Sequence, residues 1–305
     1  MPVHPSPPSD VPSLIEAYRH TLISFADVAD GMREDDWARP TTCPGWTARD
    51  ILAHVVHVED YLTGSEHPAA DWVPRDDLEP VEIGAPEHVR HAFGVWVEEG
   101  VRARQQREPA DLLAELRGLV ELRSAHMYDP DLTLETPVRS VMDASAPFGE
   151  LTRLRISDVW VHEQDLREML NRPGSLDAAG ASQFVDHVVG ALPRVVLRRV
   201  RPEPGTVIIL ESTGPVMARG GVRIGTDADG ELVWHELFAG HTEAAGRFPM
   251  VHEADEEDRA TTIAMSTHEL TRRAAGRRTT EDTAYHVVGD EDLARRVVDA
   301  LAVTP

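Results

Sequence analysis

Lysine is absent from this sequence, and all 30 basic residues are arginine. Without lysine, the chain cannot form a Schiff base through its own side chains and has no phosphate-loop lysine. Cysteine occurs once, as Cys43, so an internal disulfide and any zinc module built on a Cys-x-x-Cys pair are excluded. These two absences remove several common classes of enzyme and metal-binding protein.

Long hydrophobic runs and excess positive charge are also missing. No apolar run approaches the ~20 residues of a membrane-spanning helix. The net charge of −23 offers no basic face for phosphates, so neither nucleic acid nor a membrane is an expected partner. Residues 1–10 are rich in proline and serine and have no apolar core, which predicts a disordered N-terminus and no signal peptide. We therefore expect a cytoplasmic protein with small-molecule partners, as a monomer or small homo-oligomer.

The length of 305 residues favours two domains, each with its own core. The run Asn171-Arg172-Pro173-Gly174 is typical of a helix end and gives the predicted boundary, with domains over residues 11–172 and 173–305. Before it, hydrophobic periodicity predicts amphipathic helices that form a four-helix bundle, over residues 10–31, 47–62, 86–107 and 149–170. A further helix is predicted over residues 110–127, after the interruption at Pro109. The long polar segment 64–84 is interpreted as a loop that could cover a site.

After the boundary the pattern changes to that of an α+β domain. A linking helix over residues 176–199 precedes β-branched runs typical of strands. The predicted strands cover residues 206–211, 261–265 and 285–288, and a predicted hairpin over 222–237 turns at Asp229-Gly230. One predicted helix is capped by Ser266 or Thr267 and ends at Arg273, and another covers residues 291–301. The acidic run 253–258 is interpreted as a solvated loop and not as a calcium site.

Three side chains form a candidate metal site. Asp158 and His162 are four residues apart, so on a helix they lie on the same face. His54, on the predicted helix 47–62, is the best third ligand. Two histidines and one carboxylate with an open position are typical of catalytic zinc or non-haem iron. The alternatives are a solvated surface pair or a simple hydrogen bond, with His54 as an ordinary core residue.

Two runs of sequence resemble the mycothiol-dependent maleylpyruvate isomerase family, within the wider DinB-like metalloenzymes. The first is Thr42-Cys43-Pro44-Gly45-Trp46-Thr47-Ala48-Arg49-Asp50-Ile51-Leu52-Ala53-His54, and the second is Asp158-Val159-Trp160-Val161-His162-Glu163-Gln164-Asp165-Leu166-Arg167. The resemblance implies a DinB-like bundle followed by a smaller, sterol-carrier-protein-like domain. It also implies metal ligation by His54, Asp158 and His162. One departure is Asp158, where the family's characterised isomerase has the longer glutamate.

Neighbouring residues are candidates for supporting roles. Asp165 and Glu163 could orient a ligand imidazole from behind, although solvated helix charges are the alternative. His57 is interpreted as a neighbour of the site, either a surface residue or one that supports the ligands from behind. Arg155 could meet an anionic substrate, and a structural ion pair is the alternative. We predict no catalytic residue beyond the three metal ligands, because the reactive sulfur would come from the cosubstrate.

The resemblance implies a divalent metal, most simply zinc, and mycothiol as cosubstrate. A thiol that binds a metal becomes a thiolate at neutral pH. The thiolate could add to an electrophile and stay attached, as in an S-transferase, or leave after a double bond has rotated, as in an isomerase. Two other hypotheses are a non-catalytic metal-binding sensor and a thiol-independent metal hydrolase.

Overall fold

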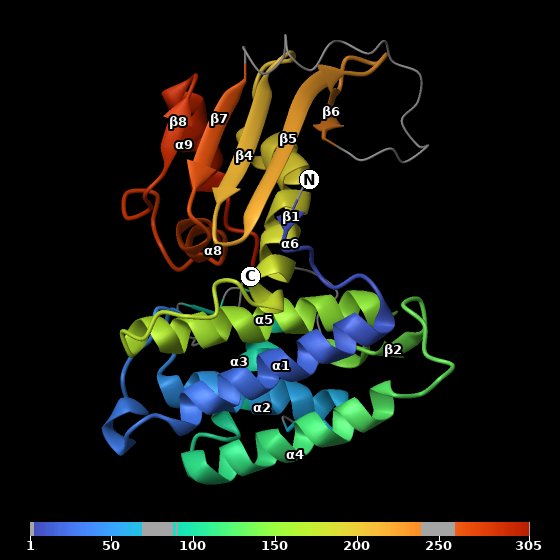
Figure 1. Ribbon diagram of the computed structural model, residues 1–305, viewed down its shortest axis with the longest axis vertical. Helices are drawn as coiled ribbons and strands as arrows, with labels where there is room; N and C mark the ends of the chain where they lie inside the picture. The colour runs from blue at the N-terminus through green and yellow to red at the C-terminus, as the bar shows by residue number, and fades with distance from the viewer. Residues whose placement is uncertain (1–2, 69–87, 90, 239–259, 305) are drawn as a thin grey trace. The chain divides into compact units, whose positions relative to one another are not determined.

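The chain forms two compact units in a computed structural model, which describes residues 3–68, 88–89, 91–238 and 260–304 (Figure 1). Residues 8–174 form a helical unit, and residues 1–7 with 175–305 form an α+β unit. This mixture of helices and a sheet confirms the expected fold class at that level. The domain limits at residues 11–172 and 173–305, and the likeness to a sterol carrier protein, stay predictions.

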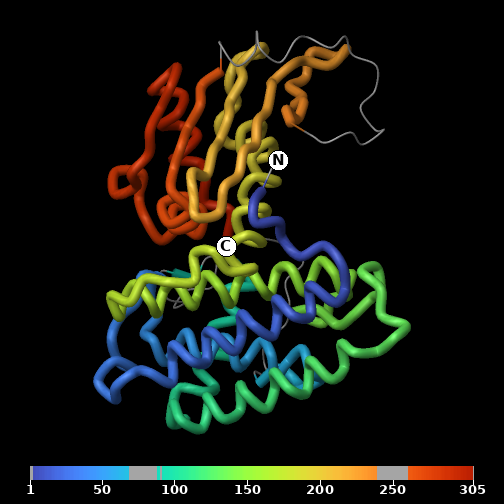
Figure 2. Tube along the Cα trace, in the orientation of Figure 1, coloured from blue at the N-terminus to red at the C-terminus, as the bar shows by residue number. Residues whose placement is uncertain are grey.

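The described part of the helical unit contains five α-helices. They are α1 (Val11–Asp30), α2 (Ala48–Leu62), α3 (Ala92–Arg102), α4 (Pro109–Met127) and α5 (Phe148–Met169). Short 3₁₀ helices and a two-stranded ribbon connect them, η1 (Glu34–Asp36), β2 (Pro137–Arg139), η2 (Val141–Asp143) and β3 (Ser145–Pro147). Helix α1 packs against α5 and α4, and α2 packs against α4 and α5, so these four helices close a ring. Figure 2 shows α1 and α5 side by side within this unit.

Helix α2 is the central helix of this unit. Eleven of its fifteen residues are buried, and it contacts α3, α4 and α5. Its start is fixed locally by a capping box, in which Thr47 and Asp50 each accept a hydrogen bond from the other's backbone N–H. This confirms the predicted start of the helix. The polar side chains of His54, His57 and Glu59 on α2 therefore face other helices and not water.

Helix α3 is shorter than the sequence predicted. The pattern predicted a helix over residues 86–107, whereas the structure begins it at Ala92, after His91 accepts a hydrogen bond from the N–H of Gly94. It ends at Arg102, and irregular turns follow up to Pro109. Most of the loop predicted over residues 64–84 lies outside the described residues. The later start arises because the His91 side chain caps the helix, and a capping residue has a non-helical backbone that ends the helix at that point.

The α+β unit contains a sheet with the strand order β1-β5-β4-β7-β8, and β6 also pairs with β5. Its strands are β1 (Val3–His4), β4 (Val207–Thr213), β5 (Met217–Thr226), β6 (Leu232–Leu237), β7 (Thr261–Met265) and β8 (His286–Val288). Strands β4 and β7 are parallel and the other pairs are antiparallel. Residues 207–210 of β4 are all buried, as expected for a strand covered on both faces. The predicted hairpin is confirmed, with Gly230 in its turn at φ +84°.

Helices pack on this sheet. Helix α6 (Ala179–Val195) contacts β5, α8 (Thr267–Ala274) contacts β4 and β7, and α9 (Glu291–Ala300) contacts β7 and β8. A π-helical turn, η3 (Val196–Val200), continues α6 past Pro193, close to the predicted helix end. Among the described residues, no helix is both long and apolar enough to span a membrane. The acidic run 253–258 lies outside the described residues.

The predicted disorder of residues 1–10 is wrong where the structure describes them. Val3 and His4 form β1, which pairs with Ala218 and Met217 of β5. Val3 is buried, and Asp10 caps α1. The composition of this segment is that of a disordered lead-in, but a β5 edge supplies backbone partners that composition does not reveal.

Candidate metal centre

The three predicted ligands converge inside the helical unit. His54 comes from α2, and Asp158 and His162 come from α5, one turn apart. His54 Nε2 lies 3.3 Å from Asp158 Oδ2, and His162 Nε2 lies 3.7 Å from Asp158 Oδ1. One ligand atom from each residue lies within 4.8 Å of the other two. The structure therefore brings together side chains separated by 104 positions in sequence.

The spacing of these atoms fits one small divalent cation. Ligand atoms about 2.0–2.1 Å from a tetrahedral zinc lie about 3.3 Å from one another. The observed separations of 3.3 and 3.7 Å are close to that value. The two imidazoles are buried, whereas the Asp158 side chain is 37 % exposed, so the cluster opens to solvent at the carboxylate. A site with one open side can receive a further ligand.

Protonation states also favour cation binding. Burial lowers the pKa of His54 to about 4, although the Asp158 carboxylate opposes the shift, so the imidazole is neutral at physiological pH. Burial alone would raise the pKa of Asp158, but Arg155, His54 and His162 hold it well below its usual range. A neutral imidazole and an ionised carboxylate are the forms that bind metals.

Asp165 orients the His162 ring. The Asp165 carboxylate is fully buried, and its Oδ2 lies 3.0 Å from His162 Nδ1, while Thr42 donates a hydrogen bond to Oδ1 at 3.0 Å. A carboxylate that accepts the Nδ1 proton leaves Nε2 unprotonated and directed at Asp158. Of the two neighbouring carboxylates considered from sequence, Asp165 is the one in contact with a ligand.

Glu163 faces a different part of the unit. Its Oε1 accepts hydrogen bonds from Ser24 of α1 at 2.9 Å and from Arg167 at 2.6 Å. Residue 163 is one position from His162, so it points about 100° away around the helix. These contacts favour a role in packing α5 on α1. Its predicted role behind a ligand imidazole stays untested.

His57 lies in an aromatic cluster on the α3 side of α2. Its ring centroid is 4.7 Å from that of Trp96, and Arg104 lies 3.2 Å from its Nδ1. Burial, followed by the nearby Arg104 charge, lowers the pKa of His57 to about 2. These contacts favour a core role for a neutral imidazole.

Arg155 contacts one of the candidate ligands, Asp158, directly. Its Nη1 donates a 2.6 Å hydrogen bond to Asp158 Oδ2, and its Nε donates to Glu59 Oε1 at 3.0 Å. The residue is only 5 % exposed. Because both ends of the guanidinium are engaged, these contacts favour the ion-pair alternative over contact with an anionic substrate, which stays a prediction.

Trp46 covers the two imidazoles. Its ring centroid lies 5.0 Å from that of His54 and 5.7 Å from that of His162, and its Nε1 donates to Glu98 Oε2 at 3.2 Å. The preceding Gly45 has φ +80°, and a Cβ there would lie 2.1 Å from His88 Nδ1. Glycine at this position therefore lets the turn carry Trp46 over the site. A tryptophan face beside the ligands excludes water from one side.

Cys43 lies close to the same centre. Its sulfur belongs to a second group of potential ligand atoms, with His162 and Asp165, within 4.8 Å of one another. The Asp165 oxygens already contact Thr42 and His162. These contacts hold the His162 ring in place, which explains the group of Cys43, His162 and Asp165 better than a second metal site does. The cluster of His54, Asp158 and His162 remains the stronger candidate for a cation.

Two residues near the site, Glu59 and Trp46, have contacts there that the sequence analysis does not predict. Trp46 lies in the run from Thr42 to His54, directly before the helix that carries His54. This position could have indicated that its ring lies near the site. Glu59 is a charged residue that directly follows the largely apolar run 51–58 of α2, and it has no exposed surface at all. A carboxylate within such a run indicates a buried partner, because an unpaired buried charge is costly.

Comparisons with known proteins point to one family. Residues 18–167 match the family model of the mycothiol maleylpyruvate isomerase N-terminal domain. Two solved structures resemble the chain, a crystal structure of the mycothiol-dependent maleylpyruvate isomerase and one of a histidine-to-alanine mutant of that protein. Each is 13 % identical and covers 90 % of this chain and 92 % of the other, with TM-scores of 0.48 and 0.49, respectively. No curated protein sequence matches.

Proposed function

The chain belongs, through its N-terminal domain, to the mycothiol maleylpyruvate isomerase family, and on this premise we propose that it is a divalent-metal-dependent enzyme with mycothiol as cosubstrate. Its substrate is an electrophile that a thiol can attack. The family description favours isomerisation of a conjugated cis double bond, with S-transfer as the alternative outcome of the same addition.

One observation supports this proposal above the others: His54, Asp158 and His162 present three ligand atoms within 4.8 Å of one another, on a side open at Asp158. These three residues would hold the metal. A bound zinc would supply a Lewis acid that lowers the pKa of a thiol. A closed structural zinc site would instead use four protein ligands.

The residues of this chain hold and shield the reacting groups. Asp165 keeps His162 in the tautomer with a free Nε2, and burial keeps His54 neutral. Trp46 shields one side of the pair from water. No side chain of the protein needs to act as nucleophile, because the cosubstrate supplies the sulfur.

The proposed reaction begins when mycothiol gives up its thiol proton to solvent, to be regained on release, and its sulfur forms a bond to one carbon of the conjugated double bond. The π electrons move onto the conjugated carbonyl, and the former double bond becomes single and rotates. In an isomerase the C–S bond then breaks, the double bond re-forms as trans, and the thiol is released unchanged. In an S-transferase a proton adds to the neighbouring carbon and the thioether leaves as product.

The test combines metal analysis with thiol-dependent turnover. We expect about one equivalent of divalent metal in the purified protein. Maleylpyruvate should be isomerised with mycothiol and much more slowly with other thiols. His54→Ala and His162→Ala should each lower metal occupancy and turnover by about 100-fold or more, since even residues behind metal ligands contribute 10–100-fold.

Other outcomes would redirect the proposal. A thioether product would identify S-transfer, and hydrolysis of a substrate without any thiol would identify a metal hydrolase. Metal binding with no turnover of any thiol and electrophile pair would favour a sensor. Variants of His54 and His162 that fold, bind no metal and retain full activity would contradict the proposed site.

A further inference from the structure

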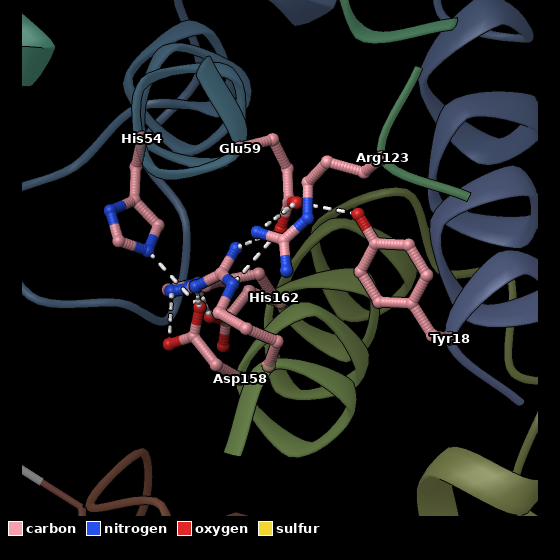
Figure 3. Close-up of polar contacts among 8 residues, drawn as sticks. Tyr18, His54, Glu59, Arg123, Asp158 and His162 are labelled. Carbon is pink, nitrogen blue, oxygen red and sulfur yellow. Dashed lines mark hydrogen bonds and ion pairs between the residues drawn. The ribbon is translucent and has the colours of Figure 1, made fainter. Parts of the chain in front are cut away.

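A fully buried carboxylate lies directly behind the candidate ligands. Glu59 of α2 accepts a 2.6 Å hydrogen bond from the Tyr18 hydroxyl through Oε2. Arg123 Nη1 lies 3.2 Å from the same oxygen as an ion pair, and Arg155 Nε donates to Oε1 at 3.0 Å. Figure 3 shows Glu59 between Arg123 and Tyr18 on one side and Asp158 and the two histidines on the other.

Arg155 is shared between two carboxylates. Its Nε and Nη2 lie 3.0 and 2.9 Å from Glu59 Oε1, while its Nη1 lies 2.6 Å from Asp158 Oδ2. Asp158 Oδ2 is also the oxygen that faces His54. A guanidinium on this oxygen competes with a cation for it, so the position of Arg155 affects how available Asp158 is.

The charges of this group balance. Glu59 and Asp158 supply two negative charges, and Arg123 and Arg155 supply two positive charges. Although burial alone would raise the pKa of Glu59, the two arginines hold it below its usual value, so Glu59 is ionised. Without the Glu59 charge, two buried guanidiniums would face a single carboxylate, and that carboxylate is a candidate metal ligand.

We propose that Glu59 is a positioning residue for the metal centre, which retains Arg155 and balances its charge so that Asp158 can bind a cation. This inference rests on the metal site of the proposed function. It assigns Glu59 a role through Arg155, with no contact to metal or substrate. Arg155 is then the residue through which the Glu59 charge reaches Asp158.

A purely structural role is the competing explanation. Tyr18, Glu59, Arg123 and Arg155 come one each from α1, α2, α4 and α5, so the network also joins the four helices of the ring. If it only holds the helices together, removal of either charge should loosen the site in the same way. If it acts on the cation through charge, removal of a negative and of a positive partner should have opposite effects.

The experiment titrates the metal-free full-length protein with Co²⁺ and follows its visible absorption, in the wild type, Glu59→Gln, Arg123→Met and the double variant. We expect Glu59→Gln to weaken Co²⁺ binding by about 10–100-fold. Arg123→Met should bind Co²⁺ more tightly than wild type. The double variant removes one charge of each sign and should return to within about threefold of wild type.

Two controls separate charge from packing. Tyr18→Phe removes a neutral contact to Glu59 and should leave Co²⁺ affinity within about twofold of wild type. Asp36→Asn removes another buried carboxylate that pairs with two arginines, Arg33 and Arg39, and should leave Co²⁺ affinity unchanged. A fall in Co²⁺ affinity in either control, similar to that in Glu59→Gln, would favour a general loss of structure and overturn the inference.

Specific results decide the two proposals separately. Wild-type protein that binds no Co²⁺ would remove the metal site and the Glu59 inference together. Wild type that binds Co²⁺, with Glu59→Gln at equal affinity, would overturn only the Glu59 inference. If Glu59→Gln does not fold, Arg123→Met and the double variant still decide, because weaker binding in Arg123→Met contradicts the charge argument.

Discussion

His162 depends on Asp165 for the orientation of its ring. The 3.0 Å contact between Asp165 Oδ2 and His162 Nδ1 fixes which ring nitrogen is available, and Thr42 fixes the carboxylate in turn. Glu163, although also fully buried on α5, contacts Ser24 and Arg167 instead. We therefore expect a substitution at Asp165 to change metal binding and a substitution at Glu163 to leave it unchanged.

We predict that Asp165→Asn weakens divalent-metal affinity by about tenfold, because the amide is a weaker acceptor for the His162 Nδ1 proton. Isothermal titration with Zn²⁺ measures the effect. Glu163→Gln is the matched control, and it should lower thermal stability while it leaves the Zn²⁺ affinity unchanged. Equal losses of affinity in the two variants would show that the contact with the ring is not what matters.

Buried neutral histidines make stability depend on pH. Burial and Arg104 lower the pKa of His57 to about 2, compared with about 6.5 in an unfolded chain. Below pH 6.5 the unfolded state therefore binds a proton that the folded state does not. The stabilisation is complete above pH 6.5 and is lost as pH falls.

We predict that between pH 6.5 and 5 the free energy of unfolding of the metal-free protein falls by about 2 kcal/mol through His57. In His57→Gln, the number of protons taken up on unfolding should fall by close to one, so the unfolding free energy should depend less steeply on pH. Urea unfolding at both pH values measures it. An equal slope in the variant and the wild type would show that His57 is protonated in the folded state.

At the scale of elements, α3 approaches α2 closely at Gly100. A Cβ at Gly100 would lie 2.0 Å from His57 Cδ2, far inside van der Waals contact. The Trp96 and His57 rings meet beside it at a centroid distance of 4.7 Å. The glycine therefore allows the two helices to pack with a histidine ring between them.

We predict that Gly100→Ala destabilises the protein by about 1–3 kcal/mol, because the methyl group overpacks the contact between α3 and α2. Gly118 is exposed on α4, and a methyl group added there would have no atom within 4 Å. Gly118→Ala should therefore stabilise by about 0.5–1 kcal/mol through helix propensity. Chemical denaturation of both variants provides the comparison. A destabilising Gly118→Ala would contradict the packing explanation.

At the scale of the whole molecule, the candidate metal centre lies entirely within one unit. The three candidate ligands, Asp165 and the Glu59 network belong to residues 8–174, and the family match covers 18–167. The segment at residues 1–7 belongs to the other unit, where Val3 pairs with β5. The chain thus begins in one unit, builds the second, and returns to complete the first.

We predict that a fragment of residues 8–174 folds and binds one divalent cation with an affinity within about threefold of the full chain, because no ligand comes from outside it. Circular dichroism and Zn²⁺ titration of the fragment measure this. A helical fragment that binds no metal would show that the other unit contributes to the centre. A fragment of residues 175–305 lacks β1 and should be the less stable piece, since part of the β5 edge is uncovered.

The amino-acid sequence by itself determined the local parts of this protein. Thr47 and Asp50 set the start of α2, and the four-residue interval placed Asp158 and His162 on one face of α5, because helix geometry follows from backbone and spacing. The same rule could have separated Asp165 from Glu163, since positions three apart face each other and adjacent positions do not. The change from helical to strand periodicity indicated the α+β unit.

Only the tertiary structure decided which of these parts meet. His54 approaches Asp158 because α2 packs against α5, and Glu59 meets Arg123 and Arg155 because α2 packs against both α4 and α5. The ordering of Val3 and His4 likewise depends on a strand more than 200 residues later. Contacts of this kind depend on how helices and sheet edges pack, which short-range spacing does not encode.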